Sequence, residues 1–121
     1  MPHVVLSGRV TLEQVADRFE PFVTRNGATV IKVERLYRER QDRAVLLETL
    51  VADHGHTQKF FIQLTPRDEG LTVRLEPLTD PEKTPGVKRA LAAVADHIVR
   101  STGCVYARSN IEEYLIRQGG S

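Results

Sequence analysis

Four stretches of alternating apolar and polar residues lie between residues 29 and 77, and this pattern constrains the fold more than any other feature of the chain. Alternation with a period of two is typical of strands that bury one face. Short connections between such strands favour antiparallel pairing. We therefore predict an antiparallel meander whose strands cover residues 29–38, 43–53, 57–65 and 70–77.

The last two of these strands have a register that suits both of their faces. If Leu64 lies opposite Leu71, the apolar residues of the two strands share one face. The same register places Phe61 opposite Arg74 on the other face, where a ring and a cation attract each other. We expect a hairpin with residues 66–69 as its loop.

The strands of the first hairpin, residues 29–38 and 43–53, have apolar residues on both faces, so the pattern does not determine how they pair. In residues 29–38, Ile31 and Tyr37 share one face, whereas Leu36 lies on the other. A slip of one residue exchanges the faces of a strand. The turn near residues 40–41 lacks the glycine that would settle the register.

Helical spacing of apolar residues predicts a helix on each side of the meander. The first covers residues 12–23, begins with a capping box formed by Thr11 and Gln14, and is kinked at Pro21. The second ends at Gly103. It begins at Asp80-Pro81 or at Thr84-Pro85, since both pairs place proline after a capping residue.

Shorter elements are expected near both ends of the chain. Residues 3–10 and 104–107 predict short strands, and Ser109 with Glu112 predicts the start of a final helix. The chain should therefore be an α+β fold. It should have an antiparallel sheet of four to five strands, two long helices on one face, and a short C-terminal strand and helix. We expect a single domain over residues 1–118 and a flexible tail at residues 119–121.

The sheet face opposite the helices is left with apolar side chains, and a monomer seldom exposes that much apolar surface. Arginines gather around the turn of the first hairpin beside it. We predict an interaction surface composed of Leu36, Leu46, Leu50, Phe61, Arg35, Arg38, Arg40 and Arg43. Acidic residues are interleaved with these arginines and neutralise much of their charge, which argues against nucleic-acid binding without excluding it.

Composition excludes several other classes. The net charge of +1 creates no long-range field for nucleic acid or an anionic membrane. No apolar run is long enough to span a membrane, and the N-terminus does not resemble a signal peptide, so a cytoplasmic location is expected. Cys104 is the sole cysteine and cannot form an intrachain disulfide.

No catalytic or cofactor motif is present, and we expect no cofactor. His54 and His56, next to Asp53, are weak candidates for metal binding. Zinc needs three or four converging ligands, and Gly55 between the histidines indicates a tight turn instead. A polar hairpin turn is the favoured interpretation.

These observations favour a non-enzymatic protein-interaction module, expected to form a homodimer or to bind another protein. Its order of helix, antiparallel meander and helix is similar to that of small dimeric chaperones such as type III secretion chaperones. One alternative is a small-molecule binding protein or enzyme, with a pocket between the sheet face and the C-terminal helix near Tyr37, Tyr106 and Arg108. Another is nucleic-acid binding through the arginine-rich hairpin.

Overall fold

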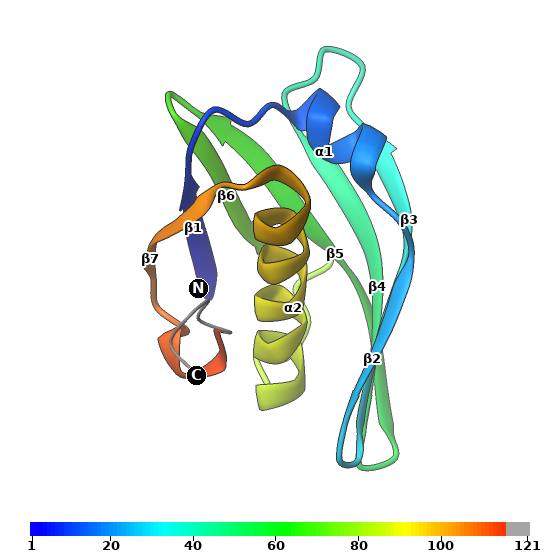
Figure 1. Ribbon diagram of the computed structural model, residues 1–121. Coiled ribbons are helices and arrows are strands. Elements are labelled where there is room, and N and C mark those ends of the chain that lie inside the picture. Colours follow the sequence, from blue (N-terminus) through cyan, green and yellow to red (C-terminus); the bar gives the residue numbers. More distant parts are fainter. Residues whose placement is uncertain (116–121) are drawn as a thin grey trace.

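The computed structural model describes residues 1–115 as a seven-stranded antiparallel sheet curled into a half-barrel around one long helix (Figure 1). The strands are β1 (His3–Ser7), β2 (Phe22–Asn26), β3 (Thr29–Arg38), β4 (Val45–Asp53), β5 (His56–Arg67), β6 (Gly70–Leu75) and β7 (Val105–Ser109). The helices are α1 (Leu12–Arg18), α2 (Pro85–Thr102) and a 3-10 turn, η1 (Glu112–Tyr114).

The prediction of four to five strands with two long helices is therefore wrong. The strand order is β2-β3-β4-β5-β6-β1-β7, so the expected meander forms the centre of a larger sheet. Three further strands extend it, β2 on one side and β1 and β7 on the other. The tail predicted at residues 119–121, and the end of the predicted domain at residue 118, lie outside the described residues.

The first helix is shorter than predicted because Pro21 ends it instead of kinking it. Thr11 and Gln14 form the predicted capping box, with each side chain accepting a hydrogen bond from the other residue's backbone N–H at 3.1 Å. Phe19 then adopts an extended conformation with φ −67° and ψ 133°. Proline lacks a backbone N–H and disfavours the helical conformation in the residue before it. Residues 22–26 consequently form β2, which pairs with β3.

A β-bulge at Glu34 resolves the two-faced pattern of β3. The register with β4 shifts between Val33 and Arg35, so Glu34 is the extra residue. Ile31 and Val33 face the core before the bulge, and Leu36 packs against the core after it. The prediction that Leu36 belongs to the opposite face is wrong, because one inserted residue exchanges the faces of the rest of the strand.

The β5–β6 hairpin has the predicted faces but not the predicted register. Leu64 lies opposite Val73 instead of Leu71, a shift of two residues. A shift of two keeps every side chain on its own face, because the side-chain period of a strand is also two. The strands continue to a tight turn at Arg67–Gly70, which is two residues farther than the predicted loop allowed.

The chain after β7 forms η1 and not the predicted α-helix. The Ser109 hydroxyl accepts a hydrogen bond from the backbone N–H of Ile111 at 2.9 Å, only two residues ahead. The same hydroxyl donates to the backbone carbonyl of His3 in β1 at 3.1 Å. Ser109 therefore closes a turn onto the sheet instead of capping the third residue of a helix.

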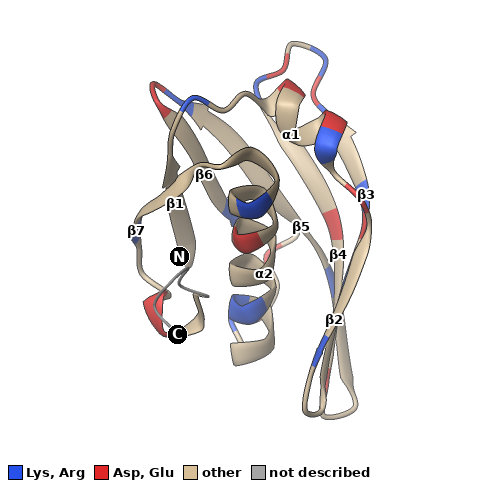
Figure 2. Cartoon of the chain, viewed as in Figure 1, with Lys and Arg blue, Asp and Glu red and all other residues tan. Residues whose placement is uncertain are grey.

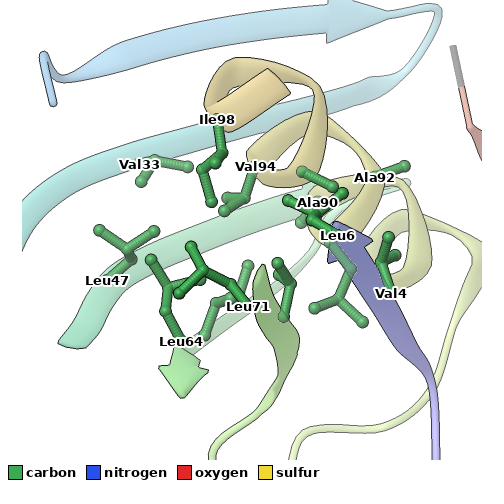
Figure 3. Packing of buried hydrophobic residues seen from close by; sticks show 14 of the residues in the cluster. Val4, Leu6, Val33, Leu47, Leu64, Leu71, Ala90, Ala92, Val94 and Ile98 are labelled. Carbon is green, nitrogen blue, oxygen red and sulfur yellow. The ribbon is translucent and has the colours of Figure 1, made fainter. Parts of the chain in front are cut away.

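The helix α2 lies in the concave face of the sheet, where its apolar side packs against strands on both sides of the half-barrel (Figure 1). Thr84 caps its start, accepting from the backbone N–H of Val87 at 3.2 Å, and Gly103 ends it in the left-handed conformation with φ 79°. Figure 3 shows side chains of this core, among them Val4, Leu6, Val33, Leu47, Leu64, Leu71, Ala90, Ala92, Val94 and Ile98. Over residues 1–115, no helix has both the length and the apolar character needed to cross a membrane.

Candidate functional site

The convex face of the sheet, which we call the outer face, is turned away from α2. Alternation along the strands assigns to it the partly or fully exposed positions of β3 to β6 that face neither α2 nor the core. Its side chains in the centre of the sheet are Lys32, Arg35, Tyr37, Leu46, Glu48, Leu50, Lys59, Phe61, Gln63 and Arg74. Both helices lie on the opposite side of the sheet (Figure 1).

Two aromatic side chains meet at the centre of the outer face. The rings of Tyr37 and Phe61 are in edge contact, with centroids 5.9 Å apart and an interplanar angle of 88°. The Tyr37 hydroxyl donates a hydrogen bond to Glu48 at 3.2 Å. A hydrogen bond with Tyr37, and then the negative charge of Glu48, raise the pKa of the neighbouring Arg35 guanidinium. The carboxylate of Glu48 is therefore held by its neighbours.

Cations flank these aromatic rings. Lys32 and Lys59 lie on either side of Leu50 in one row of neighbouring strand positions. Arg74 lies beside Gln63 and donates from Nε to its side-chain oxygen at 2.8 Å. Against the four cations Lys32, Arg35, Lys59 and Arg74, the acidic residues on this part of the outer face are Glu48 and Glu76, which lies opposite Phe61 just after β6. The centre of the outer face is therefore basic, although the net charge of the whole chain is only +1.

A groove of about 450 Å³ runs along one edge of this basic centre. Tyr37, Leu46 and Phe61 form its apolar part, and the turn that follows β6 closes one side. Leu78 in that turn is 94% exposed, which is unusual for a leucine. The remaining lining residues are Arg38, Glu39, Ala44, Gln63, Glu76 and Thr79.

The arginines of the β3–β4 loop do not form an open cationic cluster. Arg38 binds Asp42 at 2.9 Å, and Arg43 approaches Glu39 at 3.5 Å. Backbone hydrogen bonds from Gln41 and Arg43 lower the pKa of Glu39, so its carboxylate is also held within the loop. Figure 2 shows basic and acidic residues following one another along this loop.

The structure divides the predicted interaction surface. Leu46, Leu50, Phe61 and Arg35 lie together on the outer face. Leu36 lies on the core side, and Arg38, Arg40 and Arg43 lie at the end of β3 and in the loop beyond it. The predicted surface omitted Lys32, Lys59 and Leu78. The face of Lys32 in β3 was left open by the sequence, and the position of Leu78 depends on where β6 ends.

The histidines considered for metal binding lie at the β4–β5 turn. His54 and His56 are exposed, and Nε2 of His54 is 3.3 Å from the Asp53 carboxylate. Over residues 1–115, no group of three or more histidine, cysteine or acidic residues is arranged to hold a metal ion. Cys104 is buried, and its sulfur accepts a hydrogen bond from the Thr102 hydroxyl at 3.2 Å.

Of the three residues predicted near a ligand pocket, Tyr37 alone lines the outer groove. Tyr106 and Arg108 lie in β7 and line a separate hollow of about 70 Å³ beside η1. Tyr106 is half-buried, and burial, followed by the negative charge of Asp96, raises the pKa of its hydroxyl to about 12. The structure therefore does not bring the three predicted residues together.

Comparison with known proteins gives two matches among curated proteins, whereas no family model and no solved structure matches significantly. A tRNA (guanine-N(7)-)-methyltransferase from Aquifex aeolicus is 30% identical over 56 residues, covering 46% of this chain and 19% of the relative. A protein of the same name from Thermotoga maritima is 28% identical over 99 residues, covering 81% of this chain and 30% of the relative. The chain thus spans less than a third of the length of either relative. Both relatives are named as enzymes, and this contradicts the prediction of a non-enzymatic interaction module in favour of its alternatives, whereas the expected homodimer stays a prediction.

Proposed function

We propose that this chain binds RNA through the outer face of its sheet, and that it supplies the RNA-binding step of a tRNA-modifying activity. The observation that carries the proposal is that cations lie beside aromatic rings on a sheet face that neither described helix covers. The similarity to proteins named as tRNA methyltransferases supports RNA as the class of ligand. Because the chain covers so little of those relatives, the proposal concerns binding and leaves methyl transfer to the longer proteins.

The chemistry of the outer face suits an unpaired RNA segment. Proteins bind single-stranded RNA by stacking its bases on aromatic side chains and by contacting its phosphates with lysine and arginine. Tyr37 is 44% exposed and stands beside Phe61, while Lys32 and Lys59 are exposed in the next row of the sheet. A strand of RNA crossing the sheet would meet rings and cations within the same few strands.

The outer face is a better RNA-binding surface than the β3–β4 loop. The loop arginines Arg38 and Arg43 already pair with acidic residues, so binding a phosphate requires breaking those contacts. On the outer face, Glu48 is held by Tyr37, and no ion pair involving Lys32 or Lys59 occurs among the described residues. These two lysines can therefore approach phosphates directly.

The salt dependence of binding tests the proposal quantitatively. Four outer-face cations, Lys32, Arg35, Lys59 and Arg74, give a slope of log K against log salt concentration of up to about −2.8, from about −0.7 per neutralised phosphate in a single strand. Fluorescence anisotropy with a labelled tRNA transcript between 50 and 200 mM salt, a range of about fourfold in concentration, measures this slope. Salt-independent binding, or no binding at the lowest salt, contradicts the proposal.

Charge-reversal variants locate the binding surface. Lys32→Glu combined with Lys59→Glu should weaken tRNA binding by about tenfold or more and make the slope shallower, since two phosphate contacts are lost. Lys88→Glu, on α2 at the opposite side of the sheet, changes the net charge as much as Lys32→Glu or Lys59→Glu alone, is the matched control for these single variants, and should bind like the wild type. Arg40→Glu tests the loop, and a loss confined to this variant would assign binding to the loop instead.

A further inference from the structure

The groove beside Tyr37 has the shape and the apolar lining of a site for one flat ring. Its volume of about 450 Å³ falls within the range of small-ligand pockets, about 300–1,000 Å³. The Tyr37 and Phe61 rings meet at nearly a right angle and Leu46 lies between their strands, so the wall is formed by apolar and aromatic carbon. Leu78 projects from the facing turn with 94% of its surface exposed. A ring inserted here would cover that leucine.

Of the polar side chains that line the same groove, Arg38 pairs with Asp42, and Glu39 accepts from backbone N–H groups of its own loop. Thr79 accepts from the Phe61 N–H and donates to the Glu76 carbonyl.

Gln63 and Glu76 each keep an unused polar atom, and hydrogen bonds fix what each presents. Arginine can only donate, so the Gln63 atom that Arg74 Nε contacts at 2.8 Å must be the amide oxygen. The Gln63 amino group is then left as a donor. One oxygen of Glu76 accepts from the backbone N–H of Leu78 at 2.9 Å. The other accepts no hydrogen bond from the described residues and is left as an acceptor.

Gln63 and Glu76 are placed as diagonal neighbours on one sheet face. Gln63 pairs with Arg74, and Glu76 follows two positions after Arg74 while donating its own N–H to the carbonyl of Phe61 at 2.9 Å. Diagonal neighbours are close enough for long side chains to contact one ligand together. The groove thus ends in one donor beside one anionic acceptor.

This donor and acceptor match a single nucleobase. The Watson–Crick edge of guanine carries the O6 acceptor next to the N1–H and N2–H donors, and the remaining Glu76 oxygen has two lone pairs with which to accept from both donors. Adenine and cytosine present a ring-nitrogen acceptor where guanine presents N1–H, and uracil places a second carbonyl oxygen toward the carboxylate. A carboxylate in an RNA-binding surface repels phosphates, so a pairing with base donors accounts for its place there.

We propose that the groove lined by Tyr37, Leu46, Phe61 and Leu78 binds the base of an unpaired guanosine in RNA, with Gln63 donating to O6 and Glu76 accepting from N1–H and N2–H. This inference rests on the proposed RNA binding by the outer face. It adds a base preference that neither phosphate contacts nor ring stacking supplies, because both of those act on every base alike.

Uridine-rich hexamers that differ at one central base test the preference. Hexamers with a central guanosine, inosine or adenosine are titrated with the full chain at about 50 mM salt, where phosphate contacts are strong. The guanosine hexamer should bind about tenfold more tightly than the adenosine hexamer, as expected for one bidentate base contact. Inosine lacks only the N2 amine of guanosine, so its hexamer should bind with intermediate affinity.

Glu76→Gln provides the matching protein variant. The glutamine oxygen can still accept from the Leu78 N–H, whereas the amino group now faces the guanine donors. The variant should lose the preference for guanosine over adenosine, and its melting temperature should stay close to that of the wild type. Glu69→Gln removes the same charge from an exposed turn outside this groove and should keep the preference.

The outcomes separate the two proposals. Equal affinity for the three hexamers, or a preference that survives Glu76→Gln, overturns the guanosine site and leaves RNA binding standing. If neither the hexamers nor the tRNA transcript binds, RNA binding fails and the guanosine site fails with it. A guanosine preference lost in Glu76→Gln and kept in Glu69→Gln supports both.

Discussion

Gly70 allows β1 to lie against the turn of the β5–β6 hairpin, and replacing it with alanine tests this arrangement. A Cβ atom at Gly70 would lie 1.9 Å from the backbone oxygen of Leu6. Ordinary contacts are about 3.5 Å, so β1 would have to move away by roughly 1.5 Å. Gly70 also has φ 145°, a conformation that residues with a side chain rarely adopt. Backbone strain and the steric clash therefore act together.

The expected loss follows from these two effects. A residue held in a glycine-only backbone region costs about 1–3 kcal/mol, and overpacking against a fixed neighbour costs about 1–3 kcal/mol. Gly70→Ala should therefore destabilise the fold by about 4 kcal/mol. At about 4 °C per kcal/mol for a domain of this size, the melting temperature should fall by about 16 °C.

Gly55→Ala is the matched control. Gly55 also has a positive φ, 79°, but a Cβ there would meet nothing within 4 Å, so only the backbone cost of about 1 kcal/mol applies. Its melting temperature should fall by about 4 °C. Differential scanning calorimetry of both variants measures the contrast. Equal losses would mean that β1 does not lie against Gly70, and the placement of β1 beside β6 in the sheet would be refuted.

The other predictions concern the bulge and a half-buried histidine. Deleting Glu34, the extra residue of the bulge, should restore strict alternation in β3 and keep Arg35 and Tyr37 on the outer face, so tRNA affinity should be retained, as in Glu34→Ala. A folded deletion variant that loses tRNA binding would contradict the assignment of Glu34 as the extra residue. Burial lowers the pKa of His97, against the opposing charges of Glu20 and Asp96. The unfolded chain therefore takes up a proton more readily as the pH falls below about 6.5, so stability should decrease through that range and level off below the folded pKa. Urea unfolding at a pH of about 7.5 and a pH of about 5.5 should show a smaller decrease in His97→Gln than in the wild type; an equal decrease would assign the pH dependence to other groups.

Local patterns predicted the elements whose signals lie within a few residues. The alternation in β4 placed Leu46 and Leu50 on the face away from the helices, and the intervening residues Val45, Leu47, Thr49 and Val51 are buried on the other face. The helix α2 begins after Thr84, one of the two starts that the sequence allowed, and ends at Gly103 as predicted. The alternation and the helix caps both depend on residues a few positions apart, so the local sequence is enough to predict them.

Long-range pairing and single inserted residues could not be predicted in this way. Nothing near residues 3–7 indicates that they pair with residues 70–74 on one side and residues 105–109 on the other. The bulge at Glu34 follows from the packing of Leu36 into a core that only the folded sheet creates. Without the bulge, the alternation along β3 assigns Leu36 to the wrong face.

The sequence predicted residues of the candidate site only on strands for which it also predicted which side chains face away from the core. Leu46 and Phe61 were assigned to the face away from the helices, and they line the groove there. The interleaved acidic residues predicted that the charge of the loop arginines would be neutralised. The sequence did not predict which residues pair, and the structure shows these pairs, such as Arg38 with Asp42. The groove also needs Leu78, from a turn whose position depends on where β6 ends.

The position of β1 between β6 and β7 has a consequence for synthesis of the chain on the ribosome. The apolar residues Val4, Val5 and Leu6 are made before both of the strands that flank them, which are completed only at residues 75 and 109. Non-local pairing of this kind is slow, and an unpaired apolar strand can pair with other chains while it waits. The nascent chain therefore depends on shielding of its first strand until β7 has emerged.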